Sequence, residues 1–277
     1  MNISLSFSPC PNDTFIFDAM LHHKIDTEGL QFDVKMADVE QLNRDGFKDG
    51  ADVIKLSFHA FAFLTEKYEL LDSGSALGNN CGPLLVCKIP GKDLSFFQNK
   101  TIAIPGEFTT ANFLLNLAMP EATNKIEMLF SDIENAVINE SVDAGLIIHE
   151  NRFTYREKGL HKIIDLGEYW QSLTNGPIPL GGIAVKRSLP SDIKHKINRV
   201  LKKSVEYAFA NPSSGYDFIK LHAQEMEESV IYSHINLYVN KFSLNLGIEG
   251  KRAIELLFEK AREKNVVPEI SNNLFLT

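Results

Sequence analysis

Apolar and polar residues alternate with a period of two in short segments of this chain, which indicates strands with one buried face. Residues 3–7 alternate isoleucine, leucine and phenylalanine with serine, and residues 30–36 repeat the alternation. Short apolar runs bounded by turn residues predict further strands. These runs are residues 52–56, 101–104, 126–130 and 144–148.

Segments between the predicted strands carry apolar residues three and four positions apart, which is the helical period. The predicted helices are 12–21, with Asn12 or Asp13 as the cap, and 39–47, 58–67, 109–117, 131–139, 193–208 and 253–261. Residues 175–182 are rich in glycine and proline and are predicted to be a turn-rich connector.

Alternating strands and helices predict an α/β fold with mixed or parallel sheets. The chain is expected to cross between two lobes near residues 88–93 and 176–183. Residues 1–90 and 181–277 would then form the first lobe, and residues 91–180 an inserted second lobe. This is the layout of the two-lobed, periplasmic-binding-protein-like type II fold, in which a ligand cleft lies between lobes and a hinge closes it.

Composition narrows the possible partners. The 277 residues are 44% hydrophobic and 23% charged, which is ordinary globular usage. A net charge of −8 without a basic stripe argues against nucleic acid, and no apolar run approaches the roughly 20 residues of a membrane helix. The basic residues that do cluster are expected on the solvated face of one helix: Lys194, Lys196, Arg199, Lys202 and Lys203.

The N-terminal residues carry no charged region followed by an apolar run, so we predict no secretory signal. The three cysteines, an odd number, fit a reducing environment, and the expected location is cytoplasmic. The oligomeric state is not predicted.

Polar residues stand at the predicted carboxyl ends of four strands, where ligands of open α/β sheets collect. They are the Asn12-Asp13-Thr14 segment, Ser57, Thr109 with Thr110, and His149. Three of these four groups lie at or just before a helix start, where unpaired N–H groups favour a carboxylate or phosphate. The expected partner is a small carboxylate-bearing molecule, and the alternative is that each residue only caps its own helix.

His149 is the candidate general base, because an imidazole with a pKa of about 6.5 accepts a proton near neutrality. The alternative is a histidine without a chemical role. The other histidines and the cysteines form no metal-ligand motif, and the glycines form no phosphate loop, so no metal or cofactor is predicted. Cys10 is interpreted as a small packing residue, with a nucleophile as the alternative.

Several segments together form a recognisable set of motifs. They are Ser8-Pro9-Cys10-Pro11-Asn12-Asp13-Thr14-Phe15-Ile16-Phe17, Lys55-Leu56-Ser57, Ser75-Ala76-Leu77-Gly78, Gly82-Pro83, Pro105-Gly106, Thr109-Thr110-Ala111, Ala144 to Glu150, Arg152-Phe153-Thr154-Tyr155, Tyr238-Val239-Asn240 and Phe242-Ser243. In these motifs the chain resembles the 1,4-dihydroxy-6-naphthoate synthases, which act in the futalosine route to menaquinone. The resemblance covers practically the whole chain.

The resemblance implies a type II binding-protein-like fold and a carbon–carbon lyase. The expected reaction converts cyclic dehypoxanthine futalosine to 1,4-dihydroxy-6-naphthoate and releases a sugar-derived fragment. His149 matches the family's proton acceptor, and the residues matching its substrate-binding segments are Lys55, Leu56, Ser57, Thr109 and Thr110. The family uses no metal or redox cofactor.

Two alternatives share the expected fold. A chorismate dehydratase of the same pathway is not expected to carry the motif of residues 8–17. A non-catalytic solute-binding protein is expected to carry a signal peptide, and replacing His149 would leave its function unchanged.

Overall fold

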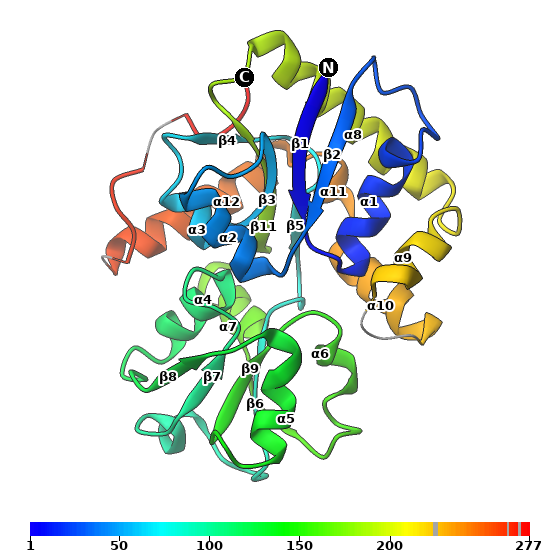
Figure 1. Cartoon of the computed structure of the whole chain (residues 1–277). Helices are drawn as coiled ribbons and strands as arrows, with labels where there is room; N and C mark the ends of the chain where they lie inside the picture. Colours follow the sequence, from blue (N-terminus) through cyan, green and yellow to red (C-terminus); the bar gives the residue numbers. More distant parts are fainter. Residues whose placement is uncertain (224–226, 265, 271–272) are drawn as a thin grey trace. The chain divides into compact units, whose positions relative to one another are not determined.

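In the computed structural model the chain divides into two units, each with its own sheet. The first unit comprises Met1–Gly78 and Pro179–Thr277, and the second comprises Asn79–Ile178. The structure describes residues 1–223, 227–264, 266–270 and 273–277. Figure 1 shows the course of the chain through both units.

The first unit contains a six-stranded mixed sheet. Its strands are β1 (Asn2–Phe7), β2 (Gln31–Met36), β3 (Val53–Ser57), β4 (Tyr68–Leu70), β5 (Ala76–Gly78) and β11 (Ile178–Lys186). The order is β2-β1-β3-β11-β4, and β5 also pairs with β11. Strand β1 is parallel to β2 and β3, whereas β11 is antiparallel to β3 and β4.

Helices of the first unit pack against this sheet. They are α1 (Pro11–Leu21), α2 (Val39–Phe47), α3 (Phe58–Ala62), α8 (Ser191–Ala210), α9 (Tyr216–His222), α10 (Glu228–Tyr238), α11 (Lys241–Leu244) and α12 (Gly247–Glu263). Helix α1 packs against α8, α9 and α10 (Figure 1). The alternate residues Ile3, Leu5 and Phe7 of β1 enter a core formed with α1, α8, α9 and α10, so the serines between them face the other side of the sheet.

The second unit contains a five-stranded sheet in the order β10-β6-β9-β7-β8. Its elements are β6 (Leu84–Cys87), η1 (Leu94–Phe97), β7 (Ile102–Ile104), α4 (Thr110–Ala118), β8 (Lys125–Glu127), η2 (Phe130–Asp132), α5 (Ile133–Ile138), β9 (Ala144–Ile147), α6 (Asn151–Thr154), β10 (His161–Asp165) and α7 (Leu166–Thr174). Strand β7 is parallel to β8 and β9, and β6 is antiparallel to β9 and β10.

The structure differs from the expected elements at several boundaries. The predicted helix 58–67 ends at Ala62, and the predicted strand 126–130 spans Lys125–Glu127. The sequence places residues 84–87 in the first lobe, but in the structure β6 pairs with β9 and β10 and therefore belongs to the second sheet. Long-range pairing, which local periodicity does not encode, determines where the second unit begins.

At the predicted connector, residues 175–182, the chain passes from the second unit to the first between Ile178 and Pro179. The segment is less turn-rich than expected, because β11 already begins at Ile178. Its glycines permit close strand packing. A Cβ on Gly181 would lie 2.8 Å from the Leu56 carbonyl oxygen, and one on Gly182 would lie 3.1 Å from the Phe58 ring. Glycine in a strand often marks such a close approach. Gly181 and Gly182 therefore belong to a strand, although glycine in the sequence suggested a turn.

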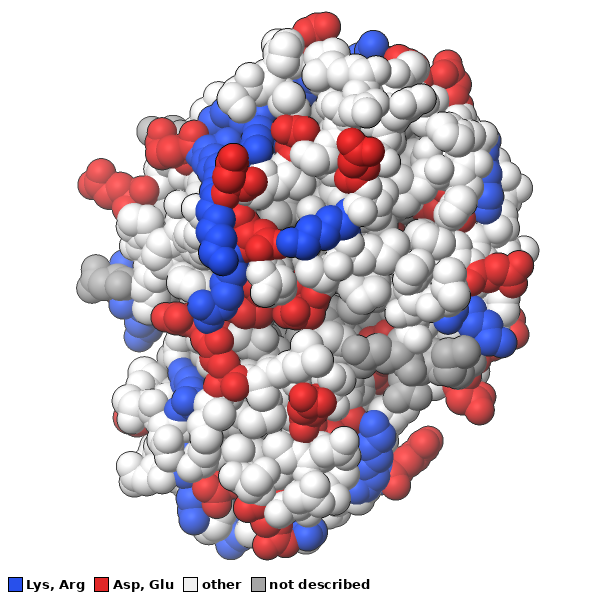
Figure 2. Space-filling model, viewed as in Figure 1, with Lys and Arg blue, Asp and Glu red and all other residues white. Residues whose placement is uncertain are grey.

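Charged side chains of both signs are mixed on the face drawn in Figure 2. On α8, Arg199 and Lys203 are exposed, as predicted, and both bind Glu28, at 2.7 Å and 3.0 Å. Lys194 is more buried than expected, because it binds Glu69. Among the described residues, no helix is long and apolar enough to cross a membrane.

Candidate functional site

The turn between β1 and α1 places two polar side chains of the first helical turn inside the protein. Pro11 is the first residue of α1 and Cys10 is its N-cap, which corrects the expectation that Asn12 or Asp13 caps the helix. Proline is well suited to this first position because it has no N–H to leave unpaired. The side chains of Asn12 and Asp13 do not cap α1 and make other contacts, described next.

Asp13 and Lys55 form a buried ion pair. The Lys55 Nζ lies 2.6 Å from Asp13 Oδ1, and the two residues are 8% and 1% exposed. The Asn12 amide donates to the same oxygen at 2.7 Å, and the Ser8 hydroxyl donates to Oδ2 at 2.8 Å. A buried carboxylate needs such partners to offset the loss of water. The turn is therefore tied to the adjacent strand β3.

Lys55 and Ser57 lie on one face of β3, and Leu56 lies on the other, because successive side chains of a strand alternate. The Ser57 hydroxyl accepts a hydrogen bond from Asn43 at 3.1 Å, and the Ser57 N–H donates to Asn43 Oδ1 at 3.0 Å. Leu56 is 1% exposed and packs beside Gly46 of α2. Any contact of Leu56 with a ligand would therefore involve its backbone.

Thr109 and Thr110 lie at the start of α4 in the second unit. Thr109 is the N-cap, and its hydroxyl accepts from the Asn112 N–H at 3.2 Å and donates to the Gly106 carbonyl at 2.8 Å. Thr110 is the first residue of α4 and is buried. Both hydrogen bonds of the Thr109 hydroxyl lie within the turn. This hydroxyl therefore caps its own helix, which was the alternative to ligand binding.

Replacing Thr109 by alanine is expected to lower the free energy of unfolding by about 0.5–2 kcal/mol, because the helix loses its cap. Urea unfolding of the wild-type protein and the variant measures the difference. Thr109→Ser keeps the hydroxyl and is the matched control. Equal losses for both variants would show that the cap contributes nothing.

His149 lies directly beyond β9 in a backbone conformation that is uncommon for residues other than glycine. Its φ is 57°, in the left-handed region. The side chain is partly buried, and its ring meets Phe130 edge to face with ring centroids 4.8 Å apart. Backbone strain of this kind persists only where the surroundings hold it, and it concentrates at functional sites.

Two clusters of polar contacts around the buried carboxylates of Glu134 and Asp165 hold the segment that follows His149. Asn151 donates to Glu134, which also binds Lys158 at 2.6 Å. Arg152 binds Asp165 at 2.7 Å and donates to the carbonyl oxygens of Asn80 and Gly82. These contacts tether α6 to α5 on one side and to β10 and the chain before β6 on the other. Sequence reasoning singled out neither Glu134 nor Asp165, because their partners are far away in the chain.

None of the three cysteines forms a disulfide, and all three are buried. Burial raises the pKa of the Cys81 thiol to about 12, so this thiol stays protonated at neutral pH. Cys10 is the N-cap of α1, and its burial agrees with its interpretation as a small packing residue.

The sites of each unit follow the carboxyl ends of neighbouring parallel strands. In the first unit, Asp13 follows β1 and Ser57 ends β3, and these strands are parallel partners. In the second unit, Thr109 follows β7 and His149 follows β9, again parallel partners. Within each unit, the structure therefore gathers the predicted polar residues at one sheet edge, the usual place for ligands in such sheets.

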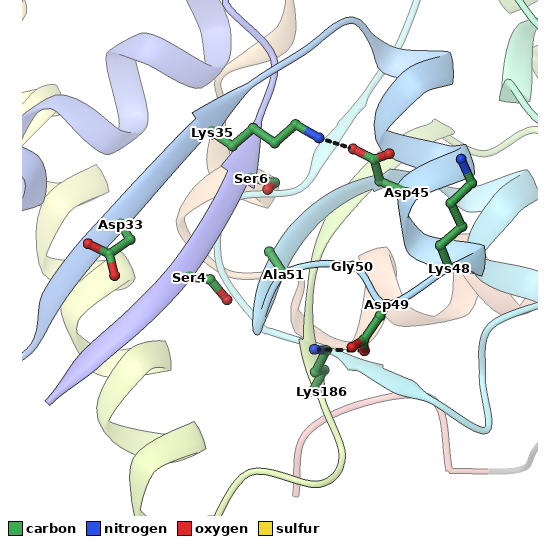
Figure 3. A pocket seen from close by; sticks show the side chains of 10 residues that line it. All are labelled: Ser4, Ser6, Asp33, Lys35, Asp45, Lys48, Asp49, Gly50, Ala51 and Lys186. Carbon is green, nitrogen blue, oxygen red and sulfur yellow. Dashed lines mark hydrogen bonds and ion pairs between the residues drawn. The ribbon is translucent and has the colours of Figure 1, made fainter.

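A separate pocket of about 390 Å³ opens on the polar side of the first sheet (Figure 3). It is lined by Ser4, Ser6, Asp33, Lys35, Asp45, Lys48, Asp49, Gly50, Ala51 and Lys186. Two ion pairs, Lys35–Asp45 and Lys186–Asp49, lie along its walls. No predicted site residue lines this pocket.

Two α/β units with mixed sheets define the class of periplasmic-binding-protein-like folds. The alkanesulfonate-binding protein SsuA from Xanthomonas axonopodis pv. citri has the same fold, with a TM-score of 0.71 at 11% identity, over 97% of this chain and 94% of that one. The predicted fold class is thereby confirmed.

The chain belongs to the menaquinone biosynthesis family, whose model matches residues 3–263. A 1,4-dihydroxy-6-naphtoate synthase of Thermus thermophilus is 39% identical over 99% of both chains. One of Streptomyces coelicolor is 38% identical over 97% of this chain and 95% of its own. A crystal structure of an Archaeoglobus fulgidus protein matches with a TM-score of 0.90 at 34% identity, over 96% of this chain and 98% of that one. These relatives support an enzyme of menaquinone biosynthesis.

Proposed function

We propose that this protein is a 1,4-dihydroxy-6-naphthoate synthase. The reaction is a carbon–carbon lyase reaction on the futalosine route, converting cyclic dehypoxanthine futalosine to 1,4-dihydroxy-6-naphthoate with release of a sugar-derived fragment. The observation that carries the proposal is 38–39% identity, over nearly the whole chain, to two proteins with that name. A cytoplasmic location stays a prediction.

In the proposed mechanism, His149 is the general base. It removes a proton from the substrate, a carbon–carbon bond breaks, and formation of an aromatic ring draws the reaction forward. The left-handed backbone and the contact with Phe130 restrict where the imidazole can point. A base with a fixed orientation is effective because it must lie within hydrogen-bond distance of the proton that it removes.

The residues proposed to bind the substrate are Lys55, Leu56 through its backbone, Ser57, Thr109 and Thr110. The chemistry of Lys55 supports this assignment, because an ammonium has three N–H donors and Asp13 receives one of them. The start of α4 adds backbone N–H groups beside Thr110, and these favour an anion. Because the Thr109 hydroxyl is occupied in the cap and its N–H lies 3.4 Å from the Gly106 carbonyl oxygen, Thr109 is proposed to contribute by holding the start of α4 in place.

Incubating the purified protein with cyclic dehypoxanthine futalosine tests the proposal, with formation of 1,4-dihydroxy-6-naphthoate followed by chromatography and mass spectrometry. Chorismate is the matched alternative substrate. Turnover of chorismate alone would make the protein a chorismate dehydratase, and binding without turnover would make it a solute-binding protein.

Replacing Ser57 or Thr110 by alanine is expected to weaken substrate binding by about 1.5–3 kcal/mol each, because each loses a hydrogen bond to a charged group. Steady-state kinetics would show this as a raised KM. Thr123→Ala, at an exposed position of the second unit, is the control. An unchanged KM in both site variants would remove the two hydroxyls from the proposed binding site.

A further inference from the structure

A buried chain of hydrogen bonds connects α10 with Lys55. His234 of α10 is 0% exposed, and its Nε2 lies 2.9 Å from Asn12 Oδ1. The Asn12 amide nitrogen lies 2.7 Å from Asp13 Oδ1, the oxygen that also binds Lys55. His234 and Asn12 are 222 positions apart in the sequence, and the motif reasoning assigned no role to His234.

The direction of each bond in this chain follows from the carboxylate at its centre. An ionised carboxylate only accepts hydrogen bonds, so the Asn12 group that faces Asp13 must be the NH₂. The Asn12 oxygen therefore faces His234, and His234 Nε2 must carry the hydrogen that is donated. Each hydrogen bond therefore donates in the same direction, from His234 to Asn12 and from Asn12 to Asp13.

The same hydrogen bonds determine the position of the Lys55 ammonium group. Lysine has a long flexible side chain, and a single ion pair leaves the position of its ammonium poorly fixed. Asp13 is held in place by Ser8 and Asn12, and Asn12 is held by His234. Removing the His234 donor frees the Asn12 amide to rotate, which removes one of the donors that orient Asp13.

We infer that His234 is a positioning residue, which holds the Lys55 ammonium in place through Asn12 and Asp13. The effect on catalysis rests on the proposed function, in which Lys55 binds the substrate carboxylate. The effect on the ammonium itself does not depend on that function, so the two can be tested separately.

The first test observes the Lys55 ammonium by ¹H–¹⁵N correlation spectroscopy of the whole protein, with Lys55→Met identifying its signal. We expect His234→Leu to shift or abolish the signal. His234→Gln, whose amide can reach the place of Nε2, should restore it. His195→Leu, on a half-buried histidine of α8 outside this chain of bonds, should leave it unchanged. A Lys55 signal identical in the wild type and His234→Leu would overturn the inference.

The second test is a double-mutant cycle on KM for cyclic dehypoxanthine futalosine. His234→Leu is expected to raise KM about tenfold and to change kcat less. In a Lys55→Met protein it should raise KM no further, because the effects of coupled residues are not additive. Equal effects of His234→Leu in both backgrounds would make its role merely structural.

Should His234→Leu not fold, Asn12→Ala breaks the same chain of hydrogen bonds and replaces it in both tests. No turnover by the wild type would overturn the proposed function alone, and the ammonium signal would still decide the inference.

Discussion

Replacing His149 by alanine or asparagine is expected to lower turnover by about 10²–10⁴-fold, the usual contribution of a general base. The fold should persist, because His149 lies beyond the end of β9 and the neighbouring segment is held by Arg152 and Asn151. Single-turnover and steady-state assays with cyclic dehypoxanthine futalosine measure the loss, and circular dichroism checks the fold.

The matched control is His161→Ala, which removes an exposed histidine of the same unit. It should leave kcat near the wild-type value. The asparagine variant has a further use, since Asn at a left-handed position is better tolerated than alanine and separates loss of the base from backbone strain. Near-wild-type turnover by either His149 variant would exclude this residue as the base.

Replacing Asp13 by asparagine is expected to lower the free energy of unfolding by about 3–5 kcal/mol, because it leaves the buried charge of Lys55 without its partner. Asparagine also brings an NH₂ group toward donors that now meet a carboxylate oxygen, from Ser8 on one side and Asn12 on the other. Urea unfolding followed by fluorescence or circular dichroism measures the change.

Glu249→Gln is the control, because Glu249 forms an ion pair with Lys241 in which both side chains are more than half exposed. Such surface pairs contribute about 0–1 kcal/mol. The double variant Asp13→Leu with Lys55→Met should recover only part of the lost stability, since removing both charges avoids an unpaired one but leaves the Ser8 and Asn12 donors without their acceptor. A loss in Asp13→Asn no larger than in the control would show that the buried pair does not stabilise the fold.

The candidate site could be located from the sequence only in part. Ser57, Thr109 and His149 follow apolar runs, and a side chain after a buried strand is predictably near a sheet edge. The use of each hydroxyl could not be predicted in the same way. Ser57 accepts from Asn43, and Thr109 caps α4, because tertiary packing brings those partners within reach.

The sequence by itself determined the family and many of the local elements. Strand β1 and helix α2 follow from side-chain periods of 2 and 3.6. The backbone geometry of strands and helices sets these periods, and burial of one face makes them visible in the sequence. The motif of residues 8–17 indicated the family because it combines rigid prolines with specific polar residues in a short segment.

Only the tertiary structure decided which distant residues meet. Residues 178–182 form part of a strand because β3 and β5 pair with β11, although glycine and proline there suggest a turn. Asp13 and Lys55 are 42 positions apart, and Asn12 and His234 are 222 apart, so no local pattern pairs them. Burial makes these polar contacts obligatory, and which groups are buried together depends on how the helices pack on the sheet.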